Sequence, residues 1–117
     1  MTQHSGSCHC GNVRYEADLD LSVPVIECNC SYCLRNGFLL SFIPESKFSL
    51  LSGKEELTEY RFNKKVISHL FCRTCGVQCF GEGTSADGAK TVAVNVRTLE
   101  NIDLSTIVRQ PYDGKSQ

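Results

Sequence analysis

The amino-acid sequence predicts a mainly β fold organised around metal ions. Short segments of strand length recur along the 117 residues, and none keeps the i, i+3, i+4, i+7 spacing of an amphipathic helix. The eight cysteines gather in tight clusters instead of being scattered. The length and an ordinary composition, with 41% hydrophobic and 21% charged residues, predict a single domain over residues 1–117.

Two of the first three predicted strands precede the middle cysteine cluster in the sequence, and the third follows it. Residues 12–17 alternate apolar and polar side chains, as a half-buried strand does. Residues 23–28 are rich in β-branched side chains and run directly into Cys28. Residues 38–43 have the length and aromatic content of a strand, and Pro44 ends it.

The later predicted strands lead to the last cysteines and beyond them. Residues 48–53 and 57–62 form two strands, with Gly53 as the turn signal between them. Residues 66–71 run into Cys72. Residues 91–97 show the cleanest alternation in the sequence.

The net charge and the N-terminal residues argue against nucleic-acid binding, membrane association and secretion. The formal net charge is −1, which gives no overall attraction to nucleic acid or to an anionic membrane. The first residues lack the basic and apolar regions of a secretory signal, and the longest apolar-rich stretch is far too short to span a bilayer. We expect a cytoplasmic protein that binds neither nucleic acid nor membrane. Because the cytosol keeps thiols reduced, we expect metal ligands rather than disulfides.

The first and last cysteine clusters predict one shared metal site. Cys72-x-x-Cys75 places two sulfurs on one metal within a tight turn, and this leaves a tetrahedral zinc two ligands short. Cys8-x-Cys10 can supply them, because residues two apart on a strand share a face. Four thiolates close the coordination sphere, so we interpret this site as structural.

The middle cluster, Cys28, Cys30 and Cys33, has three thiolates and no obvious fourth ligand in its own loop. Three protein ligands with an open position are typical of a catalytic zinc. Three thiolates on Zn²⁺ give a net charge of −1, which weakens activation of water and suits exchange with an incoming thiolate. The pattern therefore predicts a thiol substrate.

Two alternatives remain at this point. If Cys79 reached the middle cluster, the chain would hold two closed four-cysteine sites and no catalytic metal, although residues 77–80 are interpreted as a strand in which Cys79 is buried. His69 precedes Cys72 by three residues and could support the metal ligands without binding the metal, but we expect it to be a solvent-facing strand residue. No general base can be named from the sequence.

Three motifs now resemble one known family. Residues 6–15 (Gly-Ser-Cys-His-Cys-Gly-Asn-Val-Arg-Tyr), residues 28–35 (Cys-Asn-Cys-Ser-Tyr-Cys-Leu-Arg) and residues 71–76 (Phe-Cys-Arg-Thr-Cys-Gly) have its order and spacing. The chain resembles the glutathione-dependent formaldehyde-activating enzyme family, whose domain also occurs in centromere protein V. The motif core covers about residues 6–104.

The resemblance implies several short coiled antiparallel β-sheets and two zinc ions per chain. Its structural zinc maps to Cys8, Cys10, Cys72 and Cys75, and its catalytic zinc maps to Cys28, Cys30 and Cys33. The implied activity is that of S-(hydroxymethyl)glutathione synthase, a carbon–sulfur lyase that takes glutathione and formaldehyde.

Residues in and directly after the middle cluster are candidates for contacts with the substrate. Arg35 and Tyr32 are the nearest candidates for contacts with glutathione, and Arg35 is the single basic residue in this stretch. The tail after the last predicted strand is short, so we expect no binding wall of the kind that a longer C-terminus would build. A non-catalytic zinc scaffold and a thiol-binding or redox-sensing module are the alternative functions.

Overall fold

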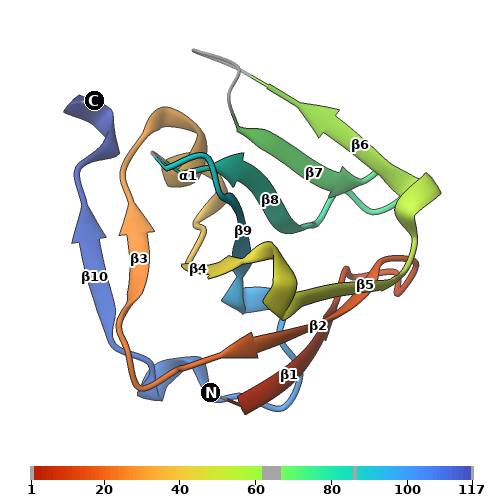
Figure 1. The fold of residues 1–117 in the computed structure, drawn as a ribbon, viewed down its shortest axis with the longest axis horizontal. Helices are drawn as coiled ribbons and strands as arrows, with labels where there is room; N and C mark the ends of the chain where they lie inside the picture. The colour runs from red at the N-terminus through yellow and green to blue at the C-terminus, as the bar shows by residue number, and fades with distance from the viewer. Residues whose placement is uncertain (1, 62–66, 86, 117) are drawn as a thin grey trace.

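A computed structural model describes residues 2–61, 67–85 and 87–116, and their strands form two sheets (Figure 1). The smaller sheet has the order β1-β2-β5 and is antiparallel throughout. It contains β1 (Thr2–Ser7), β2 (Arg14–Leu19) and β5 (Phe48–Ser52). Every second residue of β2 is buried, which confirms the half-buried strand predicted there.

The larger sheet has the order β10-β3-β4-β9-β8-β7-β6. Its strands are β3 (Val25–Cys28), β4 (Leu40–Pro44), β6 (Leu57–Tyr60), β7 (Ser68–Cys72), β8 (Gln78–Thr84), β9 (Lys90–Asn95) and β10 (Arg109–Tyr112). The predicted strands at residues 57–62 and 66–71 correspond to β6 and β7, although residues 62–66 lie outside the described part of the chain.

The mainly β prediction, with its antiparallel pairing, is confirmed, and the structure adds one parallel pair. β10 runs parallel to β3 at the edge of the larger sheet. No strand was predicted there, because four residues that include Pro111 carry little strand signal. A proline is tolerated at this position since an edge strand has one unpaired side.

A short helix, α1 (Ser31–Asn36), contains Cys33 and begins directly after Cys30. It was not predicted, because six residues are too few to show helical periodicity. The helix begins where the Cys30 sulfur accepts a hydrogen bond from the Cys33 backbone nitrogen, and it ends at Gly37, which has a φ of 71°. Five 3₁₀ turns connect other elements: η1 (Glu45–Lys47), η2 (Lys54–Glu56), η3 (Val96–Thr98), η4 (Leu104–Thr106) and η5 (Gly114–Ser116). None of the described helices is long and apolar enough to cross a membrane.

An aromatic stack joins the two sheets. Tyr15 of β2 stacks on Phe48 of β5 with ring centroids 5.3 Å apart, and Phe48 lies 4.6 Å from the ring of Phe80 in β8. Gly6 makes room for this stack, because a Cβ atom there would lie 2.4 Å from the Tyr15 ring. The Tyr15 hydroxyl also lies 2.7 Å from the Thr98 hydroxyl. These contacts hold the smaller sheet, with the turn that follows β1, against the larger sheet.

Candidate metal centres and the pocket beside them

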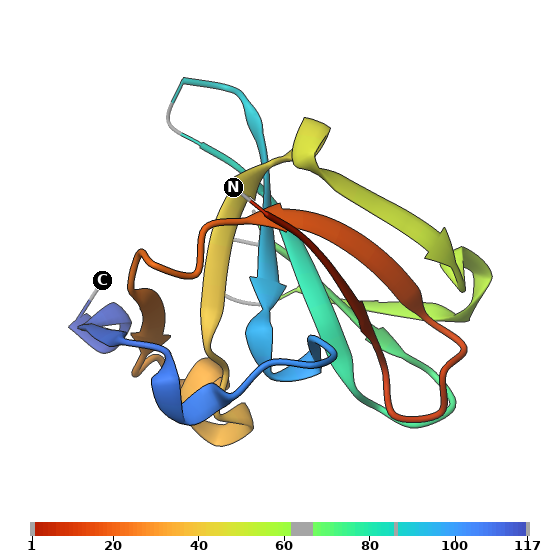
Figure 2. The ribbon, with the colours of Figure 1, turned by 90° about the horizontal axis from the view of Figure 1, so that it is seen from below.

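The first and last cysteine clusters come together in the structure as predicted. The turn between β1 and β2 lies beside the turn between β7 and β8 (Figure 2). The sulfurs of Cys8, Cys10, Cys72 and Cys75 all lie within 4.8 Å of one another. Cys10 Sγ is 3.6 Å from both Cys8 Sγ and Cys72 Sγ. A tetrahedral zinc with Zn–S bonds of about 2.3 Å separates its sulfurs by about 3.8 Å, so this donor set fits zinc.

Two glycines shape the turns that carry these cysteines. Gly11 follows Cys10 with a φ of 83°, and Gly76 follows Cys75 with a φ of 80°. Both values lie in the left-handed region that glycine enters without strain. Each turn thereby brings its two sulfurs to one side.

Backbone amides favour thiolates in this group. The pKa of Cys75 is lowered to about 6, since the backbone N–H groups of Val77 and Cys10 outweigh the opposing effect of burial. The pKa of Cys72 is also lowered, chiefly by the backbone N–H of Cys75. Zinc binds the deprotonated form of cysteine, so the lowered pKa values of Cys72 and Cys75 favour metal binding. The hydrogen bond from the Asn12 backbone lowers the pKa of Cys10, but burial and the neighbouring cysteine side chains outweigh it and raise this pKa to about 12, so Cys10 gives up its proton only to the metal.

Cys79 belongs to neither cysteine group of the described chain. Its side chain lies in the hydrophobic core and interacts with the side chain of Thr98. Burial raises the pKa of Cys79 to about 12, which keeps the thiol neutral. The alternative of two closed four-cysteine sites therefore finds no fourth ligand in Cys79.

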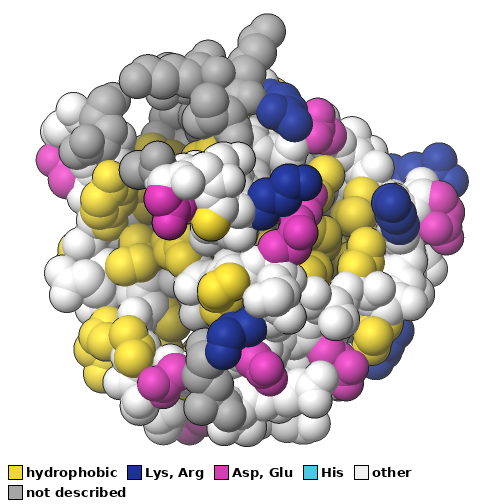
Figure 3. Space-filling model, in the orientation of Figure 1, with side chains coloured by type: hydrophobic (Ala, Val, Ile, Leu, Met, Phe, Trp, Pro, Cys, Tyr) yellow, Lys and Arg dark blue, Asp and Glu magenta, His cyan; other side chains and the backbone are white. Residues whose placement is uncertain are grey.

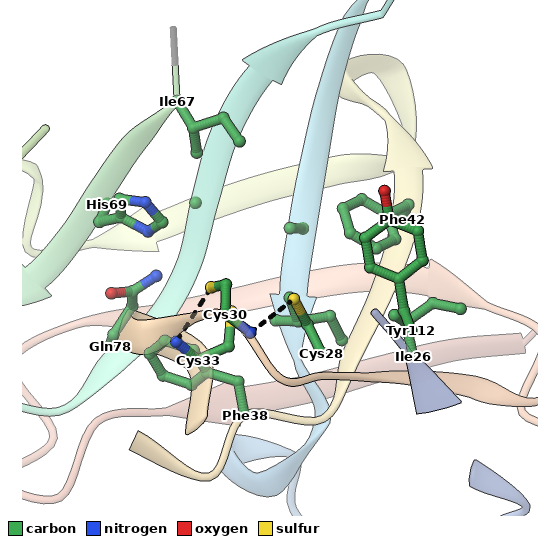
Figure 4. A pocket seen from close by; sticks show the side chains of 13 residues that line it. Ile26, Cys28, Cys30, Cys33, Phe38, Phe42, Ile67, His69, Gln78 and Tyr112 are labelled. Atoms are coloured by element: carbon green, nitrogen blue, oxygen red, sulfur yellow. Dashed lines mark hydrogen bonds between the residues drawn. The ribbon is translucent and has the colours of Figure 1, made fainter. Parts of the chain in front are cut away.

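The middle cysteines form a second group at the junction of β3 and α1. The sulfurs of Cys28, Cys30 and Cys33 lie within 4.8 Å of one another. The Cys30 backbone nitrogen donates to Cys28 Sγ at 3.4 Å, and that of Cys33 donates to Cys30 Sγ at 3.3 Å (Figure 4). Within the described residues, no fourth His, Cys, Asp or Glu completes this group. Three sulfur donors with one open position fit a zinc that accepts a guest ligand.

The pKa values of Cys30 and Cys33 in this second group shift in opposite directions. Burial alone would raise the pKa of Cys30, but hydrogen bonds from the backbone N–H groups of Cys33 and Tyr32 and from the neighbouring cysteine side chains together lower it. The pKa of Cys33 is raised, mainly because its side chain is removed from water. Cys30 is thus the thiolate that the local backbone stabilises.

The C-terminal tail packs against Cys28 and Cys30, beside β3 (Figure 1). The side chain of Asn29 donates to Asp113 Oδ1 at 3.1 Å and accepts from the Lys115 backbone nitrogen at 2.9 Å. Gly114 lies so close that a Cβ atom there would be 2.5 Å from Cys28 Sγ. The tail is short, yet a parallel edge strand followed by one turn brings it to the site.

A hollow of about 460 Å³ opens beside the three sulfurs. Hydrophobic side chains supply most of its walls, with Ile67 on one side and Phe42 and Tyr112 on the other (Figure 4). The described residues that line it are Ile26, Cys28, Cys30, Cys33, Phe38, Leu40, Phe42, Ile67, His69, Gln78, Gly81, Ala93 and Tyr112. On the face drawn in Figure 3, hydrophobic side chains gather over β3 and β10, and no described Lys or Arg is visible beside them.

His69 and Gln78 are polar residues of this hollow, although His69 was predicted to lie elsewhere and no role was predicted for Gln78. His69 is 8% exposed and faces the hollow, so the expectation that it faces bulk solvent is wrong. Its strand, β7, is paired on both sides inside the larger sheet, and α1 packs over that face through Tyr32. Burial lowers the pKa of His69 below its ordinary 6.5, which keeps the imidazole neutral at neutral pH.

The two predicted glutathione contacts lie outside the lining of this hollow. The Tyr32 hydroxyl donates to Gln78 Oε1 at 2.7 Å, and its ring centroid is 4.3 Å from that of His69. Tyr32 therefore contacts both polar residues, through a hydrogen bond to Gln78 and a ring contact with His69. Arg35 is exposed on α1, where its Nη1 donates to the Ser31 carbonyl at 3.0 Å. A contact of Tyr32 or Arg35 with a ligand stays a prediction.

Comparison with known proteins places these features in a family. The family model described as glutathione-dependent formaldehyde-activating enzyme matches residues 3–111. A crystal structure of a Rhodobacter sphaeroides protein is 31% identical and has a TM-score of 0.79, and the alignment covers 92% of this chain and 97% of that chain. Since the family match extends over both cysteine groups and nearly the whole sequence, the chain belongs to the glutathione-dependent formaldehyde-activating enzyme family.

Proposed function

We propose that this protein is a zinc-dependent carbon–sulfur lyase, which makes and breaks adducts between a small thiol and a carbonyl compound. The family description indicates glutathione and formaldehyde as the reference pair. The observation that carries the proposal is the three-cysteine group, which lies at the wall of a 460 Å³ hollow and lacks a fourth protein ligand among the described residues. The four-cysteine group then serves as a structural zinc site.

The metal and the chain have separate tasks in this reaction. A zinc ion held by Cys28, Cys30 and Cys33 would keep a guest thiol deprotonated, which is its nucleophilic form. The chain leaves one position free on the side of the 460 Å³ hollow, and Gly114 packs against Cys28.

His69 is the group in the hollow that we assign to proton transfer. When the adduct forms, the thiol loses a proton and the carbonyl oxygen gains one, and cleavage reverses both steps. The neutral imidazole of His69 can accept and return that proton, since burial lowers its pKa. The ring of Tyr32, 4.3 Å away between centroids, fixes the orientation of the imidazole.

Exchange of ¹³C-labelled formaldehyde between its hydrate and its glutathione adduct tests this proposal by NMR. The wild-type protein should exceed the spontaneous rate, and Cys30→Ser should return it to the uncatalysed value while one metal ion per chain remains. Cys79→Ala is the matched control, because Cys79 lies in neither cysteine group. If Cys30→Ser exchanges as fast as wild type, the protein is not this lyase.

A redox-sensing module is the second candidate. The lowered pKa of Cys30 beside an open hollow favours it, because oxidation follows thiolate character and access. Release of one metal ion at low peroxide concentration, with no acceleration of adduct exchange, would favour sensing over lyase activity.

A further inference from the structure

Two hollows of different character meet at the three-cysteine group. The first is the 460 Å³ hollow described above, and the second has a volume of about 440 Å³. Both are lined by Cys28, Cys33, Phe38 and Tyr112. A sulfur atom held at the cysteines has two substituents in any thioadduct, so one substituent can enter each hollow.

The two hollows differ in charge. Among the described residues that line the first hollow there is no Lys, Arg, Asp or Glu. The second hollow is lined by Glu27, Asn29 and Asp113, and Arg109 lies 3.6 Å from Glu27. The ammonium group and amides of a polar thiol such as glutathione can pair with these carboxylates and the Asn29 amide, whereas its own two carboxylates must point away from Glu27 and Asp113 into solvent. A polar thiol placed in the first hollow would lose water without gaining charge partners.

The strand register explains why the first hollow is deep. Ala93 of β9 pairs with Phe42 of β4 on one side and with Gly81 of β8 on the other. Gly81 pairs in turn with His69 of β7. Two small residues therefore form the floor in the middle of the sheet, and Phe42 and His69 stand on either side of it. Side chains paired across a sheet point to the same face, so the strand register determines the shape of this part of the first hollow. We call it the trench: its floor is Gly81 and Ala93, and Phe42 and His69 flank the floor.

The walls of the trench remain exposed although they are strongly apolar. Phe42 is 55% exposed and Ile67 is 47% exposed. A further hollow of about 310 Å³ shares Phe42, Ile67, Gly81 and Ala93, so the trench continues along β8 and β9 beyond the cysteines. An elongated apolar group would fit this shape.

Formaldehyde is too small for this space. If each heavy atom takes the volume of one liquid water molecule, about 30 Å³, then formaldehyde occupies about 60 Å³. Most of the 460 Å³ would remain unfilled, and the apolar walls would gain nothing from formaldehyde. A carbonyl compound with a longer apolar substituent fills the trench and removes its walls from water.

We propose that the preferred carbonyl partner is an aldehyde with an apolar chain or ring. The substituent lies in the trench between Phe42 and Ile67, and the polar thiol lies against the second hollow. This inference rests on the proposed carbon–sulfur lyase function. In the reaction, the sulfur lone pair forms a bond to the carbonyl carbon, the C=O π pair moves to oxygen, and oxygen takes the proton that the thiol loses. Nothing is oxidised or reduced, and cleavage is the reverse.

Equilibrium binding of S-alkylglutathiones to the metal-loaded full chain tests the trench without catalysis. By calorimetry, affinity should rise about fourfold per added methylene from S-methylglutathione to S-hexylglutathione, given about 0.8 kcal/mol for a fully buried methylene. Ala93→Leu should remove the gain of the hexyl compound and leave the methyl compound unchanged. Ile67→Asp should do the same, whereas Leu51→Asp, at another exposed apolar residue, should not. Equal affinity along the series would overturn the inference.

Kinetics with glutathione and either formaldehyde or hexanal separate this inference from the function on which it rests. A kcat/KM for hexanal at least tenfold above that for formaldehyde supports the inference. Acceleration of formaldehyde exchange with no gain for hexanal overturns the inference and leaves the lyase function standing. Acceleration of neither reaction overturns the lyase function, and the binding series then decides alone whether the trench takes an apolar group.

Discussion

Gly114 lies against Cys28 so closely that a Cβ atom would come within 2.5 Å of the cysteine sulfur. Ordinary Cβ contacts are longer than 3.4 Å, so a methyl group there must displace either the tail or the sulfur. This contact ties the last turn of the chain to the three-cysteine group, together with the hydrogen bonds of Asn29 to Asp113 and Lys115.

Gly114→Ala should therefore weaken metal binding at Cys28, Cys30 and Cys33 at least tenfold. The four-cysteine group lies elsewhere and should keep its metal. Competition with a chromophoric chelator measures both affinities in one titration. Gly83→Ala is the matched control, because a Cβ there would lie 3.6 Å from Ile67 Cγ1, an ordinary contact. Unchanged affinity in Gly114→Ala would show that the tail does not pack as described.

The two cysteine groups should differ in their effect on stability. Cys75→Ser removes a ligand from the group that joins the β1–β2 turn to the β7–β8 turn, and we expect it to lower the Tm by at least about 10 °C, since a structural metal contributes directly to folding. Cys30→Ser leaves that group intact and should lower the Tm by less than about 5 °C. Circular dichroism with metal analysis of each variant measures this. Equal destabilisation by the two variants would contradict the division into structural and open sites.

Much of this site could be predicted from the sequence, because zinc ligands obey short-range spacing. Cys72-x-x-Cys75 and Cys8-x-Cys10 each determine a local pair, and four sulfurs within 4.8 Å follow once the two turns meet. The β2 and β9 strands were predicted for a similar reason, since alternation is a local signal. Spacing also predicted the pairing of the first and last clusters, and the family resemblance, now confirmed, agreed with it.

The residues that the sequence did not reveal depend on long-range packing. His69 becomes buried only because β7 lies inside the larger sheet with Tyr32 packed over it, and a five-residue strand does not show which face that will be. Tyr112 reaches the hollow only through the parallel pairing of β10 with β3, which joins segments distant in the chain. The trench at Gly81 and Ala93 depends on the register of three strands.

Cys79 should behave as a core residue and not as a ligand. Its thiol is buried and its pKa is raised to about 12, so iodoacetamide at pH 8 should leave it unmodified in the folded protein. After unfolding in a chelator, all eight cysteines should react. Peptide mass spectrometry identifies the modified positions. Cys79→Ala should keep the same metal content and cost about 1 kcal/mol of stability, so loss of a metal ion in this variant would place Cys79 in a metal site after all.

The proton-transfer role of His69 gives a pH dependence with a defined sign. Burial disfavours the charged imidazolium, so the pKa of His69 lies below 6.5 in the folded protein. The neutral form accepts the proton, and the exchange rate should therefore be constant near neutral pH and fall as the pH drops through that lowered pKa. His69→Asn should reduce the rate at neutral pH by about 100-fold and remove this acidic limb. His4→Asn, on β1, is the control, and metal content measured at each pH separates proton transfer from loss of zinc. A His69→Asn variant that keeps its metal and the wild-type pH profile would show that His69 only lines the hollow.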